Sequence, residues 1–220
     1  MAPFGKIYSY PNNFRVERAQ VVAAYNGLEV PLAEGFQMGV TNKSPEFLAK
    51  FPMGKVPAFE GADGFCIAES AAICTYLALA GPKKAQLVGA DPKTQALISQ
   101  WTFFAENELG THILPPAIMT FFKMMPYDEQ KYNSSVTSLE RALKRLEVAL
   151  EGGKKYLVGD NVTLADIMVA GPLYFGGKFL IDAEMRKDIP NVVAWLKGLA
   201  ALPEFKALGE LVLCETRSKA

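Results

Sequence analysis

The run from Phe51 to Ile73, FPMGKVPAFEGADGFCIAESAAI, constrains the fold more than any other part of this sequence. It predicts a short strand over 56–59 and a returning strand over 65–67. The Asp-Gly pair in the turn between them supplies the positive φ that a tight hairpin requires. An apolar helix over 71–80 follows the second strand. The run therefore predicts a strand–hairpin–strand–helix unit.

Two pairs of residues in this unit point to a binding site. Val56-Pro57 opens the first strand, and a proline there has no amide hydrogen to give to a sheet ladder. A cis bond at this position would leave the N–H and C=O of Val56 free to bind a peptide-like ligand. Glu69-Ser70 precedes the helix, where a hydroxyl and the positive helix end suit an anionic group. Ser70 alone is also explained as a helix cap.

The overall composition favours a reduced, cytosolic protein and excludes several other classes. Lys+Arg and Asp+Glu number 23 each among the 220 residues, so no basic field favours nucleic acid or a membrane surface. No apolar run reaches membrane-spanning length, and the N-terminus has no secretory signal pattern. The 3 cysteines, Cys66, Cys74 and Cys214, lack metal or redox spacing. We therefore expect a cytoplasmic protein with no metal, and neither membrane nor direct nucleic-acid binding.

The N-terminal part alternates strand and helix patterns. Strands are predicted over 7–10 and 28–32, and helices over 14–25 and from Ser44-Pro45 to about residue 51. Together with the unit described above, the order is β-α-β-α-β-β-α, which is the thioredoxin-like plan. We expect this domain to cover residues 1–81.

The remainder of the chain, residues 90–220, predicts an all-helical domain. Asp91-Pro92 starts a helix, and Leu139, Leu143, Leu146 and Leu150 recur at helical spacing. A capping box over Thr163–Asp166 starts another helix, a role in folding rather than in chemistry. Aromatic residues from Trp101 to Phe122 are expected to form core, or in part a pocket for a second substrate between the domains.

The arrangement of Val56, Pro57, Glu69 and Ser70 resembles the glutathione site of glutathione transferases. The resemblance implies their fold, an N-terminal thioredoxin-like domain followed by an all-helical C-terminal domain, with glutathione as co-substrate. Longer segments, among them NKSPEFLAKFPMGKVPAFEGADGFC and YLVGDNVTLADI, resemble the N-terminal domain of the gamma subunit of translation elongation factor 1. That likeness implies a homodimer and an exchange-factor subunit as partner. A free-standing transferase and a non-catalytic dimerisation module stay open as alternatives.

The same resemblance assigns further residues to the ligand. Lys55 and Asn42 are expected at the glycyl end of glutathione. Pro11 stands where theta-like transferases place their catalytic serine, so another donor must stabilise the thiolate. Asn13, Arg15 and Tyr10 are the candidates. Each also has a structural interpretation: Asn13 as a turn residue, Arg15 as a solvated or ion-paired helix residue, and Tyr10 as part of the core.

Overall fold

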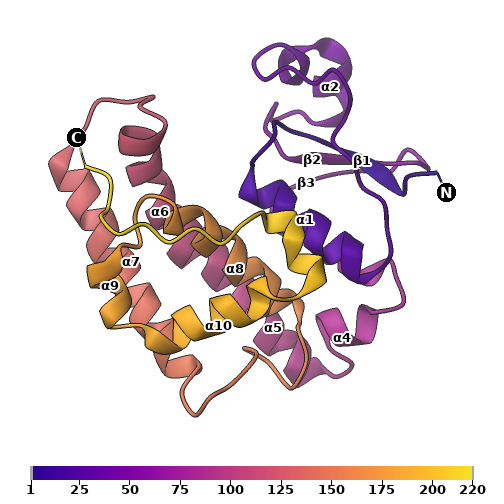
Figure 1. Ribbon diagram of the computed structural model, residues 1–220. Coiled ribbons are helices and arrows are strands. Elements are labelled where there is room, and N and C mark those ends of the chain that lie inside the picture. Colours follow the sequence, from indigo (N-terminus) through magenta and orange to yellow (C-terminus); the bar gives the residue numbers. More distant parts are fainter. Residues whose placement is uncertain (1, 220) are drawn as a thin grey trace.

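The computed structural model describes residues 2–219 as a small sheet with helices on both faces, joined to a larger array of helices (Figure 1). The N-terminal part consists, in chain order, of β1 (Gly5–Tyr8), α1 (Phe14–Tyr25), η1 (Thr41–Lys43), α2 (Pro45–Lys50), β2 (Ala58–Gly61), β3 (Cys66–Ala68) and α3 (Ser70–Leu79). The helical part consists of α4 (Lys84–Val88), α5 (Pro92–Phe104), η2 (Ala105–Gly110), α6 (Thr111–Pro116), η3 (Ala117–Phe121), α7 (Glu129–Ala149), α8 (Leu164–Gly177), α9 (Ala183–Lys187), α10 (Pro190–Ala200) and η4 (Pro203–Leu208). The predicted combination of a thioredoxin-like half with a helical half is confirmed.

The sheet has the strand order β1-β2-β3, with both pairs antiparallel. The N–H of Gly61 donates to the carbonyl of Phe65 at 2.8 Å and closes the predicted hairpin. Strand pairing starts at Ala58 rather than at Val56, because the Val56-Pro57 pair lies outside the ladder. The hairpin prediction is therefore confirmed, and the strand boundaries lie one or two residues later than predicted.

The strand predicted over 28–32 does not form. This segment runs beside β1 and makes one parallel bridge, between Ile7 and Leu32, with the N–H of Ile7 donating to Pro31 at 2.9 Å. Pro31 has no N–H and cannot extend the ladder in the other direction, which limits the pairing to an isolated bridge.

The two faces of the sheet are covered by different helices. Ile7 and Phe59 belong to the large core cluster with residues of α1 and α3. Ala58 points to the other face and packs with Phe47 and Phe51, in and just after α2. Alternation along the strands thus places α2 on the outer side and α1 and α3 between the sheet and the helical half (Figure 1).

The predicted helix starts are confirmed at their caps. The N–H of Phe47 donates to Ser44 Oγ at 3.2 Å, and the N–H of Thr94 donates to Asp91 Oδ1 at 3.1 Å. The capping box of α8 is present, with the N–H of Thr163 donating to Asp166 at 2.9 Å. Helix α4, which lies between the two predicted domains, was not predicted. Among residues 2–219, no helix has the length and apolarity needed to cross a bilayer.

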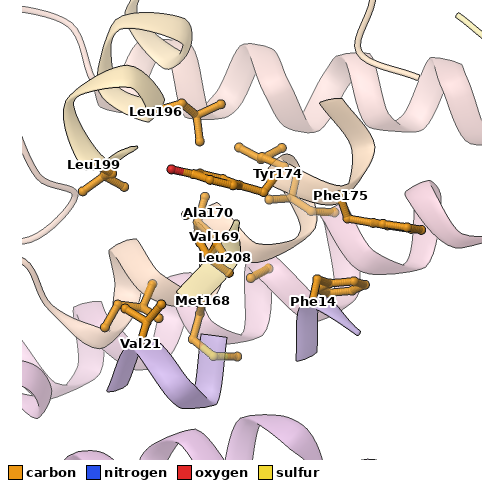
Figure 2. Packing of buried hydrophobic residues seen from close by; sticks show 14 of the residues in the cluster. Phe14, Val21, Met168, Val169, Ala170, Tyr174, Phe175, Leu196, Leu199 and Leu208 are labelled. Carbon is orange, nitrogen blue, oxygen red and sulfur yellow. The ribbon is translucent and has the colours of Figure 1, made fainter. Parts of the chain in front are cut away.

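The two halves share one hydrophobic core. Phe14 and Val21 of α1 lie against Met168 and Phe175 of α8, and Leu196 of α10 closes the cluster from the far side (Figure 2). Helix α8 is buried on all sides, as expected for a central helix that is apolar around its whole circumference. Helix α1 therefore packs on both halves, and residues in its first turns lie where the halves meet.

Candidate functional site

The Val56–Pro57 peptide bond is cis, as the sequence suggested. Val56 is half-buried and Pro57 is buried, immediately before β2. Neither the N–H nor the C=O of Val56 has a hydrogen-bond partner within the described chain. An unpaired main-chain N–H and C=O beside a sheet can hydrogen-bond the main chain of an extended peptide, as a neighbouring strand would.

The start of α3 offers a second group of unpaired amides. The N–H groups of Ser70, Ala71 and Ala72 donate to no protein atom among residues 2–219, since the first helical bond runs from Ile73 to Glu69 at 2.9 Å. Such free amides at the positive end of a helix attract an anion. Ser70 is 7% exposed, so its hydroxyl belongs to the floor of this site.

Glu69 precedes these amides with an uncommon backbone conformation. Its φ is +66°, which non-glycine residues adopt rarely. Its side chain is exposed and makes no capping hydrogen bond. The carboxylate is therefore free to pair with a cation next to the unpaired amides of α3.

Ser70 is also tied to two charged residues that the sequence analysis did not select. An Arg18 guanidinium nitrogen donates to Ser70 Oγ at 2.7 Å and forms an ion pair with Glu106. Arg18 is fully buried in α1, whereas Glu106 lies in η2, a π-helical segment of the helical half. The sequence feature that could have identified Arg18 is an arginine on the apolar face of a predicted helix, between Phe14 and Val21–Val22.

Asn13, the first candidate thiolate donor, is buried at the N-cap of α1. Its Oδ1 accepts the N–H of Arg15 at 3.1 Å, and its Nδ2 donates to Ser9 Oγ at 3.0 Å. One N–H of the amide remains unused, because a carboxamide carries two. The predicted turn role and the predicted donor role are thus compatible. Ser9, also buried, was missed because no pattern in the sequence connects it with Asn13.

Arg15 is half-buried and forms no ion pair with any described residue. Its guanidinium lies over the Phe14 ring, 4.7 Å from the centroid. Burial, followed by repulsion from Arg18, lowers its pKa. A cation that lacks a carboxylate partner favours an anion placed beside it. Tyr10, the third candidate, is 43% exposed, so the core interpretation does not apply to it.

The two residues expected at the glycyl end lie in different settings. Lys55 is exposed next to Val56 and has no ion-pair partner among residues 2–219. Asn42 is buried, and its side chain accepts from the N–H of Gly39 at 2.6 Å and donates to the carbonyl of Gly54 at 2.7 Å. Asn42 therefore braces the loop that leads into Val56.

A row of aromatic rings extends from the first turn of α1. The Phe175 ring stacks on Phe14 at 5.3 Å and on Phe122 at 5.9 Å between centroids. Phe121 and Phe122 are 45% and 46% exposed, whereas Trp101 is core. These two rings form an exposed apolar surface at one end of an aromatic stack. The other end of the stack is Phe14, which follows Asn13 in the sequence. In the part of the chain that the structure describes, no three metal-ligating side chains are grouped.

Family comparison agrees with this geometry. Residues 3–79 match the family described as the N-terminal domain of glutathione S-transferase, and residues 110–203 match its C-terminal domain. The chain belongs to the glutathione S-transferase family. Glutathione S-transferase-like protein LUC7 of a Fusarium species is 47% identical over 195 residues, 89% of this chain and 88% of that protein. Glutathione S-transferase-like protein FUS3 of Gibberella moniliformis is 41% identical over 99% of this chain and 98% of that protein.

The narrower resemblance is confirmed as well. Elongation factor 1-gamma-A of Xenopus laevis is 38% identical over 96% of this transferase-family chain, which spans only 48% of that relative. The crystal structure of the GST-like domain of yeast elongation factor 1-gamma superposes with a TM-score of 0.81 at 25% identity, covering 100% of this chain and 99% of that one. A theta class transferase from Xanthomonas, solved with glutathione bound, shares the fold at TM-score 0.80 and 22% identity, over 97% and 100% of the two chains.

Proposed function

We propose that this chain binds glutathione at the main chain of Val56 and the start of α3. The unpaired main-chain groups of Val56, close in sequence to the free amides of α3, carry the proposal. In the bound state, Val56 pairs with the main chain of the cysteinyl residue. The Ser70 hydroxyl and the α3 amides take the α-carboxylate of the γ-glutamyl group, and Glu69 takes its ammonium. Lys55 faces the glycyl carboxylate, and Asn42 holds the loop that carries Lys55.

The proposed chemistry is conjugation of the glutathione thiolate with an electrophile. A thiol has a pKa of about 8.5, so ionising it at neutral pH requires roughly 2–3 kcal/mol of selective stabilisation. Arg15 contributes an unpaired positive charge, and Asn13 contributes its remaining amide N–H. Tyr10, exposed at the same turn, is the third group within this region. The thiol proton leaves to solvent, the sulfur lone pair forms the C–S bond, and the leaving group departs with its electron pair.

The cellular role that we propose is that of an elongation factor 1-gamma domain, which anchors the nucleotide-exchange complex. The identity of 38% along nearly the whole chain supports this role. We further propose a homodimer in the cytoplasm; the cysteines Cys66, Cys74 and Cys214 are all unpaired, which suits a reducing compartment.

Glutathione binding is tested by titration calorimetry. The wild-type chain is expected to bind, and Ser70→Ala is expected to weaken binding about tenfold, the equivalent of about 1.4 kcal/mol. Ser134→Ala, at an exposed serine of α7, is the matched control and should leave the affinity unchanged. A wild-type protein that takes up no glutathione would overturn the proposal.

The catalytic and assembly roles need separate assays. Conjugation with 1-chloro-2,4-dinitrobenzene, followed by absorbance, tests the chemistry. Size-exclusion chromatography with a purified exchange subunit of elongation factor 1 tests assembly, and sedimentation equilibrium of the chain alone tests the dimer. Turnover without complex formation would favour the free-standing transferase. Complex formation without turnover would favour the non-catalytic structural module.

A further inference from the structure

A groove lies in the helical half, where the loop that follows α7 (residues 150–163) passes beside α10 (Figure 1). Its volume is about 310 Å³, at the lower end of the range of ligand pockets, about 300–1,000 Å³. It is lined mainly by apolar side chains, namely those of the buried Leu150, Trp195 and Leu199 and the half-buried Tyr156. The groove therefore suits one or two apolar side chains of another molecule.

The two sides of the groove are tied to each other by carboxylates. Glu147 of α7 accepts from the N–H of Asn191, in the first turn of α10, at 2.9 Å. Asp166 accepts from the N–H of Leu157 in the loop at 2.8 Å and from Trp195 Nε1 of α10 at 3.3 Å. The groove is thus formed in the absence of a partner, which lowers the entropic cost of binding.

Small residues bring the main chain of α10 close to the surface of the groove. Ala194 and Gly198 line it, are both exposed, and lie one helical turn apart. A Cβ placed on Gly198 would meet no other atom within 4 Å, so the space beside this residue is open. Another chain can therefore pack closely against this part of α10.

Two lysines border the groove, and no acidic residue lines it. Lys154 and Lys155 are exposed, and neither forms an ion pair with any residue in the described range 2–219. Asp160 lies in the adjoining hollow with both lysines but pairs with neither. Unpaired cations beside an apolar surface are complementary to a segment that combines carboxylates with a large apolar side chain.

We propose that this groove is a docking site for an acidic segment of a partner protein. A leucine or phenylalanine of that segment enters the groove, and carboxylates on either side of it pair with Lys154 and Lys155. The charges select acidic over basic segments, and the groove selects segments that carry a large apolar side chain. None of these residues belongs to the proposed glutathione site, so docking and glutathione binding are separate properties.

Fluorescence anisotropy with short fluorescein-labelled peptides tests the docking site. The wild-type chain is expected to bind the peptide EEDEFLEDEE with a Kd of about 10–100 μM. The peptide EEDESGEDEE keeps the carboxylates but lacks the large apolar pair, and KKRKFLKRKK keeps that pair but reverses the charge. Both should bind at least about tenfold more weakly.

Variants of the chain then locate the site. The double variant Lys154→Glu, Lys155→Glu should weaken binding of EEDEFLEDEE at least about fivefold. Gly198→Leu fills the open space beside α10 and should weaken it at least about tenfold. The matched control is Lys83→Glu, Lys84→Glu, which reverses another exposed lysine pair outside the groove and should change the affinity by less than about twofold.

The outcomes separate docking from general charge attraction. Equal binding of EEDESGEDEE, or equal weakening by the two lysine-pair variants, would overturn the proposal, because net charge alone would then explain the binding. A wild-type chain that binds none of the peptides would also overturn it. If Gly198→Leu does not fold, as judged by circular dichroism, the comparison of peptides and the surface lysine variants still decide the result.

Discussion

Replacing Asp166 by asparagine is expected to change how the stability of this fold depends on pH. Asp166 is 0% exposed and accepts from the N–H of Leu157 at 2.8 Å and from Trp195 Nε1 at 3.3 Å, besides its capping bonds to Thr163. Burial outweighs these hydrogen bonds and raises the pKa of the carboxyl to about 6. In the unfolded chain the ordinary value is about 3.9.

The direction follows from proton binding. Between about pH 4 and pH 6 the folded protein retains a proton on Asp166 that the unfolded chain has released. The contribution of this proton to stability is complete below about pH 4 and is lost as the pH rises through 6. The difference between the folded and unfolded pKa of Asp166 corresponds to roughly 3 kcal/mol of unfolding free energy. About 1.3 kcal/mol of this is lost between pH 5 and pH 7.

Urea unfolding followed by far-UV circular dichroism measures this loss. Asp166→Asn cannot bind this proton. The unfolding free energy of the wild type minus that of the variant should therefore fall by about 1.3 kcal/mol from pH 5 to pH 7. Asp160→Asn, at an exposed position, is the matched control and should follow the wild type. Parallel pH profiles for the wild type and Asp166→Asn would refute the argument that the buried carboxyl is protonated at pH 5.

Three further changes have defined outcomes. Asn13→Asp keeps a side-chain oxygen for the helix cap but removes the amide donor, so kcat should fall at least about tenfold; Asn133→Asp, at an exposed position of α7, is the control. Arg15→Gln should raise the midpoint of the kcat/KM pH profile by about one unit, and an unchanged midpoint would remove Arg15 from thiolate stabilisation. Gly177→Ala places a Cβ 2.6 Å from the Val212 carbonyl oxygen and should lower thermal stability, whereas Gly198→Ala, with open space around it, should not.

Local patterns in the sequence were sufficient to predict most of the fold. The Asp63-Gly64 turn, the Ser44-Pro45 start of α2 and the Thr163–Asp166 capping box each act within a few residues, so each is readable without tertiary information. The strand predicted over 28–32 does not form, because apolar composition alone does not predict how far pairing extends past Pro31.

The candidate site was predictable only in part, because some of its contacts join residues far apart in the sequence. A single sequence unit contains Val56, Pro57, Glu69 and Ser70, so their order was sufficient to predict a candidate site. Glu106 is 88 residues from Arg18, and no local spacing connects the two. Asn42 was selected for the ligand by likeness alone, and no local spacing predicts its hydrogen bonds to Gly39 and Gly54.

The ion pair between α1 and η2 has a practical consequence for anyone recombining members of this family. A chimera that joins the first 80 or so residues of this chain to the helical part of a relative inherits its arginine from one parent and its acid from the other. Without an acid at the position of Glu106, the chimera would contain a buried, uncompensated cation beside Ser70. Crossover libraries should therefore treat these two positions as one unit of exchange, even though they stand far apart in the gene.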